Sequence, residues 1–339
     1  MINNTIEFKC KVITPMFLHG ADNETPELRA PSIKGAMRFW WRACNGHLSL
    51  VELKKAEDAI FGSTSGRSCF GVRVKMILDE TKKEKIEDKI EKEYKVVAHH
   101  TLLIKKQGNF IKNKRKSKSW KVGSEFEVTL TLYKEQAEYN FGQTELISLF
   151  QVVSYLGGLG KRNRRGNGSF RITNGNSVKY SEFHELLNAI SIKNQDTETG
   201  YYFYEEERDK IVNNYQGYIT NYITSIVCIE RIEPFIENVE DVRYAISQAT
   251  HNENKRTSHG YGKFIGSGSP RLSSTVIFGV NKEKDVFAVI STKLRVIRNI
   301  GNMKNVIAKK ENNQEVYEIQ NSLIQEVKEQ LIKNDPRQK

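Results

Sequence analysis

Six segments of alternating or helical hydrophobicity, taken in chain order, limit the fold more than any other feature of the sequence. Period-two alternation predicts strands over 5–13, 71–78 and 124–133, and a short strand over 168–173. Helical patterns predict one helix from Pro31 to Gly46 and a largely buried one over 144–158. The order β-α-β-β-α-β is that of the ferredoxin-like unit, an antiparallel sheet with helices on one face.

The second half of the chain repeats this pattern less clearly. We expect a linking helix over 182–192, strands over 222–232, 273–280 and 285–296, a short helix over 241–250, and a closing helix after residue 315. The 339 residues suffice for two domains. We therefore expect an α+β protein of two ferredoxin-like (RRM-like) domains, 1–180 and 181–339, the second degraded, with glycine-rich basic loops.

The charge balance favours a polyanionic partner. The net charge is +12 and the isoelectric point is near 9.3, values that suit nucleic acid or an acidic membrane surface. An insert in the first domain adds eight positive charges and no acid from Lys105 to Lys121. The sequence has no bilayer-spanning run, no secretion signal and no metal-site cysteine spacing. We expect a cytoplasmic protein without membrane contact, bound metal or cofactor.

A glycine-rich basic stretch, GGLGKRNRRGNGSFR over 157–171, is the strongest candidate site. It sets five glycines among five positive charges and contains no acidic residue. Glycine lets backbone N–H groups converge on an anion while neighbouring Lys and Arg side chains supply charge. The ligand would be nucleic acid or nucleotide phosphate. The alternative interpretation is a solvated loop rich in turn residues.

The first predicted helix carries two further kinds of residue. One face is apolar and is interpreted as core rather than as a base-stacking surface: Met37, Trp40, Trp41, Cys44 and Leu48. Arg38 and Arg42 lie away from that face, near a helix start that contains Ser32 and Lys34, where free N–H groups attract phosphate. An ion pair with a nearby carboxylate is the alternative role for the two arginines.

Two other stretches are weaker candidates. Lys255, Arg256, Lys263 and Arg271 accompany a second glycine-rich segment, which is equally well interpreted as a surface loop. The sequence GSTSGRS over 62–68 offers N–H and hydroxyl groups to a phosphate, although a strand-connecting turn is favoured there.

Several of these segments together resemble a known family. ITPMFLHGADNETPELRAPSIKGAMRFWWRA, over 13–43, is similar to the opening motif of the first subunit of the type III-B CRISPR effector, the Cmr complex, within the RAMP superfamily. AIFGSTSGRSCFGVRV, GGLGKRNRRGNGSF and GSGSPRLSSTVIF resemble later segments of that subunit or superfamily, in the expected order. The strong matches cover under half of the chain, and the inserts near 79–95 and after Ile104 depart from the pattern.

The resemblance implies a non-catalytic subunit with two ferredoxin-like domains that binds single-stranded RNA in antiviral defence. Its partners would be guide RNA near the guide 3′ end, target RNA, and other RAMP subunits. The RNA-binding residues carried over are Ser32, Lys34, Gly35 and Arg38 at the helix start, and Lys161, Arg162, Arg164, Arg165 and Gly166 in the glycine-rich loop. The full candidate set adds Arg42, Arg256, Lys263 and Arg271.

Two other functions stay open at this point. Relatives in the superfamily cut RNA, some with an aspartate after the first strand, and Asp22 lies in a comparable place beside His19 and Glu24, with further loop histidines at 251 and 259. An ordinary polar loop residue is favoured because no second metal ligand has diagnostic spacing. The remaining alternative is a scaffold that contacts only proteins.

Overall fold

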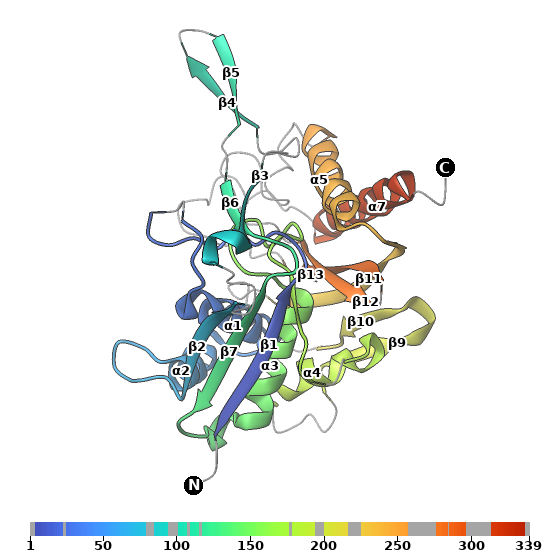
Figure 1. The fold of residues 1–339 in the computed structure, drawn as a ribbon. Helices are drawn as coiled ribbons and strands as arrows, with labels where there is room; N and C mark the ends of the chain where they lie inside the picture. The colour runs from blue at the N-terminus through green and yellow to red at the C-terminus, as the bar shows by residue number, and fades with distance from the viewer. Residues whose placement is uncertain are drawn as a thin grey trace.

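The structure is a computed structural model of the 339-residue chain (Figure 1). It describes residues 4–22, 25–78, 85–93, 101–106, 109–114, 117–175, 178–193, 200–215, 225–256, 276–283, 285–295 and 313–335.

The first sheet has four antiparallel strands. They are β1 (Thr5–Val12), β2 (Phe70–Ile77), β7 (Glu125–Leu132) and β8 (Phe170–Ile172), in the order β2-β7-β1-β8. Every second residue of β7 is buried, so the alternation that predicted this strand also fixes which face packs on the helices. Helices α1 (Ala30–Cys44) and α3 (Gln143–Leu156) follow β1 and β7 and lie behind the sheet in Figure 1. The element order β-α-β-β-α-β is therefore present, with one helix added.

Helix α1 buries the face that the sequence assigned to the core. Trp40 and Trp41 are almost fully buried, which confirms that they pack rather than offer a stacking surface. The helix begins after Arg29, which makes no side-chain cap, and Pro31 lies in the first turn. Ser32 is thus inside the helix, and the expectation that Pro31 and Ser32 begin it is off by one residue. Its last residue is Cys44, short of the expected Gly46.

The added helix, α2 (Leu50–Phe61), packs on α1 and was not expected. Ser49 and Glu52 form a reciprocal capping box at its start, and Leu53, Ala56, Ile60 and Phe61 are buried. The insert between β2 and β7 contains a short 3-10 helix (Ile86–Lys89) and two strand pairs. These are β3 (Ile90–Glu93) with β6 (Ser117–Trp120), and β4 (Thr101–Lys106) with β5 (Asn109–Lys114). The β4–β5 pair projects from the top of the molecule in Figure 1.

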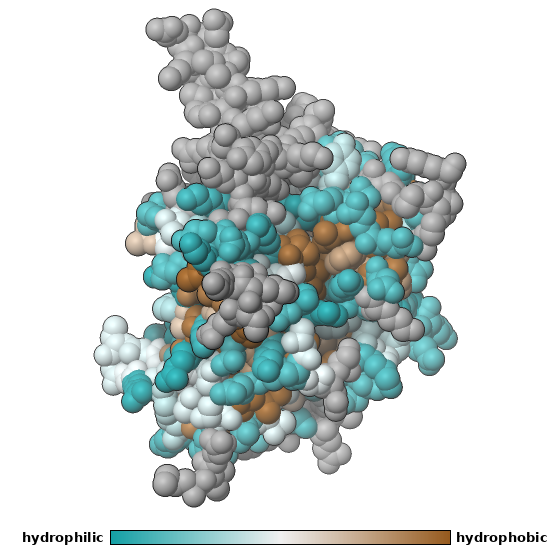
Figure 2. Space-filling view, in the orientation of Figure 1, coloured by the Kyte–Doolittle hydropathy of each residue, from teal (hydrophilic) through white to brown (hydrophobic). Residues whose placement is uncertain are grey.

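The second sheet has five antiparallel strands in the order β12-β13-β11-β10-β9. Strands β11 (Ile226–Ile236), β12 (Val276–Glu283) and β13 (Val286–Leu294) match expected strands, whereas β9 (Tyr202–Glu205) and β10 (Lys210–Asn213) were not expected. Helix α5 (Val239–Arg256) runs beyond its expected end and packs against the closing helix α7 (Asn313–Asn334). Figure 2 shows hydrophilic residues over much of the visible face and apolar ones between α5 and strands β11 and β13.

The two sheets meet in a shared core. Helix α4 (Phe183–Ala189) packs against α3, and one apolar cluster runs from the first sheet into Tyr202, Ile229 and Ile290 of the second. A second cluster joins α5 and α7 to the second sheet. The division at 180/181 stays a prediction. Among the described residues, no helix combines the length and apolarity needed to cross a bilayer.

Candidate nucleic-acid interface

The glycine-rich loop follows α3 and returns to the first sheet at β8. Its two ends are buried, and the segment 160–165 between them is partly or fully exposed. Gly160 has φ +88°, and a Cβ there would overlap the Phe17 carbonyl oxygen. Gly168 has φ +70°, and a Cβ there would overlap the Leu159 carbonyl oxygen. Both glycines are thus required by backbone conformation and close packing.

Two of the four positive charges in this segment lie over aromatic rings. The guanidinium carbon of Arg162 lies 5.4 Å from the ring centre of Phe17, and that of Arg164 lies 5.1 Å from the ring centre of Phe39. Lys161 is exposed, and its N–H donates to the Phe17 carbonyl at 2.9 Å. Burial lowers the pKa of Arg164. The aromatic contacts hold two arginines in place beside the loop backbone.

A cavity of about 300 Å³ lies between this loop and α1. On one side it is lined by Ser32, Gly35 and Phe39, and on the other by the loop, including Gly160 and Arg164. None of the described residues that line it is acidic. A Cβ on Gly35 would meet nothing within 4 Å, so the protein itself has no packing reason for a glycine there. We call this cavity the loop cavity.

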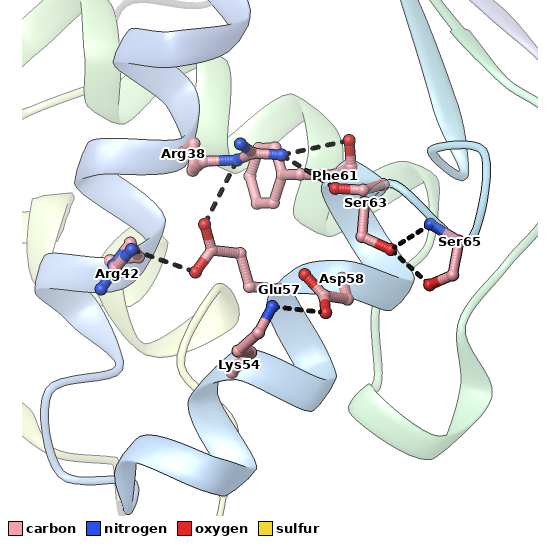
Figure 3. A network of polar contacts seen from close by, with 9 residues as sticks. Arg38, Arg42, Lys54, Glu57, Asp58, Phe61, Ser63 and Ser65 are labelled. Carbon is pink, nitrogen blue, oxygen red and sulfur yellow. Dashed lines mark hydrogen bonds and ion pairs between the residues drawn. The ribbon is translucent and has the colours of Figure 1, made fainter.

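The remaining α1 candidates face the other way. Arg38 Nε and Arg42 Nη1 lie 3.3 and 3.2 Å from the two carboxylate oxygens of Glu57 in α2, whose side chain is 13% exposed (Figure 3). Arg38 also donates to the carbonyls of Phe61 and Gly62. Both arginines therefore form the ion pair that was the alternative interpretation, because α2 places the Glu57 carboxylate against this face of α1.

Lys34 shares that second face. Its Nζ donates to the Phe70 carbonyl at 3.3 Å and lies 4.7 Å from the Phe70 ring centre. Burial, followed by the nearby charges of Arg38 and Arg67, lowers the pKa of Lys34. The sequence motif at the start of α1 is thus divided, with Ser32 and Gly35 at the loop cavity and Lys34, Arg38 and Arg42 toward α2 and β2.

Strand β12 of the second sheet and helix α5 form hydrogen bonds with the glycine-rich loop. The N–H of Phe278 in β12 donates to the Arg164 carbonyl at 3.3 Å, and the N–H of Val280 donates to Ser169 Oγ at 3.1 Å. Buried Arg243 of α5 donates from Nε to Asn167 Oδ1 at 3.2 Å. Gly166 is buried, and a Cβ there would lie 2.9 Å from Ile246 Cδ1. Gly166 is therefore required by its packing against α5 and β12, and its role in direct ligand approach stays a prediction.

The basic side chains of the second glycine-rich segment all lie outside what the structure describes. Arg256 is the last residue of α5, while its side chain and that of Lys255 lie outside what the structure describes. Lys263 and Arg271 also fall outside the described residues.

Of the residues of the nuclease alternative, the structure describes Asp22 and His19, and each is hydrogen-bonded to a neighbouring residue of the chain. Both carboxylate oxygens of Asp22 accept hydrogen bonds from Thr25, one from its backbone N–H and one from its hydroxyl. His19 Nε2 donates to the Lys118 carbonyl at 2.9 Å, and burial lowers the pKa of His19. Glu24 and His259 lie outside the described residues, as does the side chain of His251. The described part of the chain holds no cluster of three or more metal-ligand side chains.

Sequence reasoning missed several residues of these surfaces. Phe39 carries a readable signal, since it lies one turn after Gly35 and off the tryptophan face. Phe17 and Glu57 offer no comparable signal, because each is brought to the site only by packing between separate elements. Tyr133 directly follows β7 and reaches the α1–α2 surface through strand pairing with β2.

Comparisons with known proteins agree with the sequence resemblance. The RAMP superfamily family model matches residues 9–171. The CRISPR system Cmr subunit Cmr1-2 of Pyrococcus furiosus is 33% identical over 181 residues, 49% of this chain and 93% of that protein.

Two solved structures share the fold. The apo crystal structure of Cmr1 from Pyrococcus furiosus is 21% identical, with a TM-score of 0.51 over 86% of this chain and 87% of the other. A chain of the type III-B Cmr-beta complex bound to cognate target RNA and AMPPnP, in the presence of ssDNA, is 14% identical, with a TM-score of 0.57 over 97% of this chain and all of the other.

Proposed function

This chain belongs to the RAMP superfamily and, within it, to the Cmr1 family of CRISPR Cmr subunits, and on that premise we propose that it is a non-catalytic subunit that binds single-stranded RNA. It acts in a cytoplasmic type III-B ribonucleoprotein, beside other RAMP subunits, on guide and target RNA. Each of its two units, 1–180 and 181–339, is ferredoxin-like. For the first unit, the strand order β2-β7-β1-β8 supports this assignment.

The observation that carries the proposal is the loop cavity. An α1 glycine without a packing role faces a basic loop, two of whose arginines, Arg162 and Arg164, lie over aromatic rings. No acidic side chain among the described residues lines the space between them. A polynucleotide backbone needs close approach and positive charge, and both are present at this one place. RNA phosphate contacts the segment 160–165 while the sugar-phosphate backbone passes over Gly35.

A titration of purified protein into labelled single-stranded and duplex RNA of equal length, at two salt concentrations, tests this function. We expect tighter binding of the single strand and affinity that falls steeply with salt. Charge reversal at Arg162 and Arg165 weakens binding. Lys54→Glu and Lys179→Glu serve as matched controls, because these exposed lysines pair with local carboxylates in other parts of the structure.

A denaturing gel of every endpoint keeps the nuclease alternative in view. Intact RNA with salt-sensitive binding supports the proposal. A discrete cleavage product that disappears in Asp22→Ala or His19→Ala overturns the non-catalytic assignment. If the wild-type protein neither binds RNA at low salt nor cuts it, but captures a purified Cmr subunit, the result supports the protein-only scaffold over both RNA functions.

A further inference from the structure

A second cavity lies on the opposite side of α1 from the loop cavity. Its volume is about 610 Å³, it is open to solvent, and it is bounded by α1, the end of α2, the turn over 62–68 and the first residue after β7. Within the part of the chain that the structure describes, its lining includes three cationic side chains, Lys34, Arg38 and Arg67, and no carboxylate. We call it the turn cavity.

The turn that forms one wall is shaped independently of any ligand. Gly62 has φ +82°, and a Cβ there would lie 2.7 Å from the Ser68 N atom, so the turn closes tightly at this glycine. The Ser63 N–H donates to the Gly66 carbonyl at 2.9 Å, and the Ser63 and Ser65 hydroxyls lie 2.9 Å apart (Figure 3). The tip of the turn, including Arg67, is exposed.

An exposed aromatic ring stands opposite this turn. Tyr133 is 50% exposed, and the guanidinium carbon of Arg67 lies 4.3 Å from its ring centre. The ring edge is held against β2, since a Cβ on Gly71 would overlap the Tyr133 hydroxyl. A planar cation stacked on an aromatic ring is a platform on which a nucleobase stacks.

The three cations differ in how far they are neutralised. Arg38 is paired with Glu57 and bound to two carbonyls, so it helps to build the wall. Lys34 donates to a carbonyl, and no carboxylate among the described residues forms an ion pair with it. Burial, together with the nearby Arg38 and Arg67 charges, lowers its pKa. An anion between Lys34 and Arg67 would relieve this repulsion.

We propose that the turn cavity binds one nucleotide of single-stranded RNA, with its phosphate between Lys34 and Arg67 and a base on the Arg67–Tyr133 platform. This inference rests on the proposed RNA-binding function and adds a second contact on the far side of α1. An RNA that occupies both cavities passes across this helix. A carboxylate-bearing protein segment would satisfy the charge, but it would leave the aromatic platform without a role.

The test uses the full chain and a fluorescein-labelled oligouridine strand of 12 nucleotides. Arg67→Gln removes one phosphate contact, so we expect weaker binding and a log–log salt slope smaller by about 0.7. Tyr133→Leu removes the platform, and we expect a loss of about fivefold or more in affinity. Lys134→Gln and Tyr244→Leu are the matched controls. Lys134 adjoins Tyr133 without lining the cavity, and Tyr244 is a 46% exposed tyrosine on α5.

The outcomes separate this inference from the proposed function. Unchanged affinity and salt slope in both turn-cavity variants, with binding still lost in Arg162→Glu/Arg165→Glu, would overturn the turn cavity alone. Loss in the turn-cavity variants without loss in the loop variant would support the turn cavity and refute the role of the loop. Equal loss in Tyr133→Leu and Tyr244→Leu would also overturn it, because a general effect of removing a surface tyrosine would then suffice. Wild-type protein that binds no oligouridine refutes both.

Discussion

Replacing Gly35 with alanine should make the protein more stable and a poorer RNA binder. Gly35 lies within α1, and a Cβ there would meet no atom within 4 Å. Alanine is favoured over glycine in a helix by about 0.5–1 kcal/mol, because it loses less backbone entropy on folding. For a chain of 339 residues that gain corresponds to a rise of about 0.7–1.4 °C in the unfolding midpoint.

The same methyl group would project into the loop cavity, where the proposed RNA backbone passes. An added carbon in a closely packed contact costs about 1 kcal/mol or more, which is about fivefold in Kd. Gly35→Leu adds more volume with little loss of helix propensity, so its affinity should fall further while its stability stays at or above that of the wild type.

The assay pairs thermal unfolding, followed by circular dichroism, with a single-stranded RNA titration for the wild type and both variants. A higher unfolding midpoint together with weaker RNA binding would show that Gly35 serves ligand binding rather than packing. If both variants raise the unfolding midpoint but bind RNA as the wild type does, the reasoning about the loop cavity is wrong. If Gly35→Ala lowers the midpoint, the assignment of open space at this position is wrong.

Three other perturbations test the framework around the two cavities. Gly160→Ala forces a left-handed conformation and an overlap with the Phe17 carbonyl, so the free energy of unfolding should fall by about 2–4 kcal/mol; a thermal midpoint equal to the wild type would contradict this. Glu57→Gln leaves two α1 arginines without their shared carboxylate and should cost about 1–2 kcal/mol in urea unfolding, a modest figure because both arginines are partly exposed. Burial lowers the pKa of His47, so the folded state binds a proton less readily than the unfolded state. Stability should therefore be complete above pH about 6.5 and fall below it, and His47→Gln should flatten that decline in urea midpoints measured from pH 7.5 to 5.

The first sheet was predictable because its strands pack on the helices with one face. In β7, the alternating apolar residues of the sequence are the residues that are buried. Helix α2 had a readable signal that was passed over, since Ser49 and Glu52 have the spacing of a capping box. Strands β9 and β10 are four residues each, too short for a periodic pattern to distinguish them from loop.

The candidate site was predictable in composition but not in arrangement. Glycines and arginines marked the loop over 157–171, and the structure places its middle part at a cavity with Ser32 and Gly35. Arg38 and Arg42 pair with Glu57 because α2 packs against α1. The sequence pattern of α1 alone cannot predict this packing. The role of Gly166 likewise depends on Ile246 of α5, a contact between units that only the folded chain defines.

The support of the glycine-rich loop by β12 and α5 means that the candidate RNA surface is not a portable module. A fragment ending at residue 180 would keep every basic residue of the loop but lose Phe278, Val280 and Arg243. These residues hydrogen-bond to the Arg164 carbonyl and to the Ser169 and Asn167 side chains of the loop. Conversely, a neighbouring subunit that shifts α5 would alter the loop through the Arg243–Asn167 hydrogen bond without touching RNA. Assembly and RNA affinity would then be thermodynamically linked. Binding of a Cmr partner to the second unit would change the affinity of the first unit for RNA.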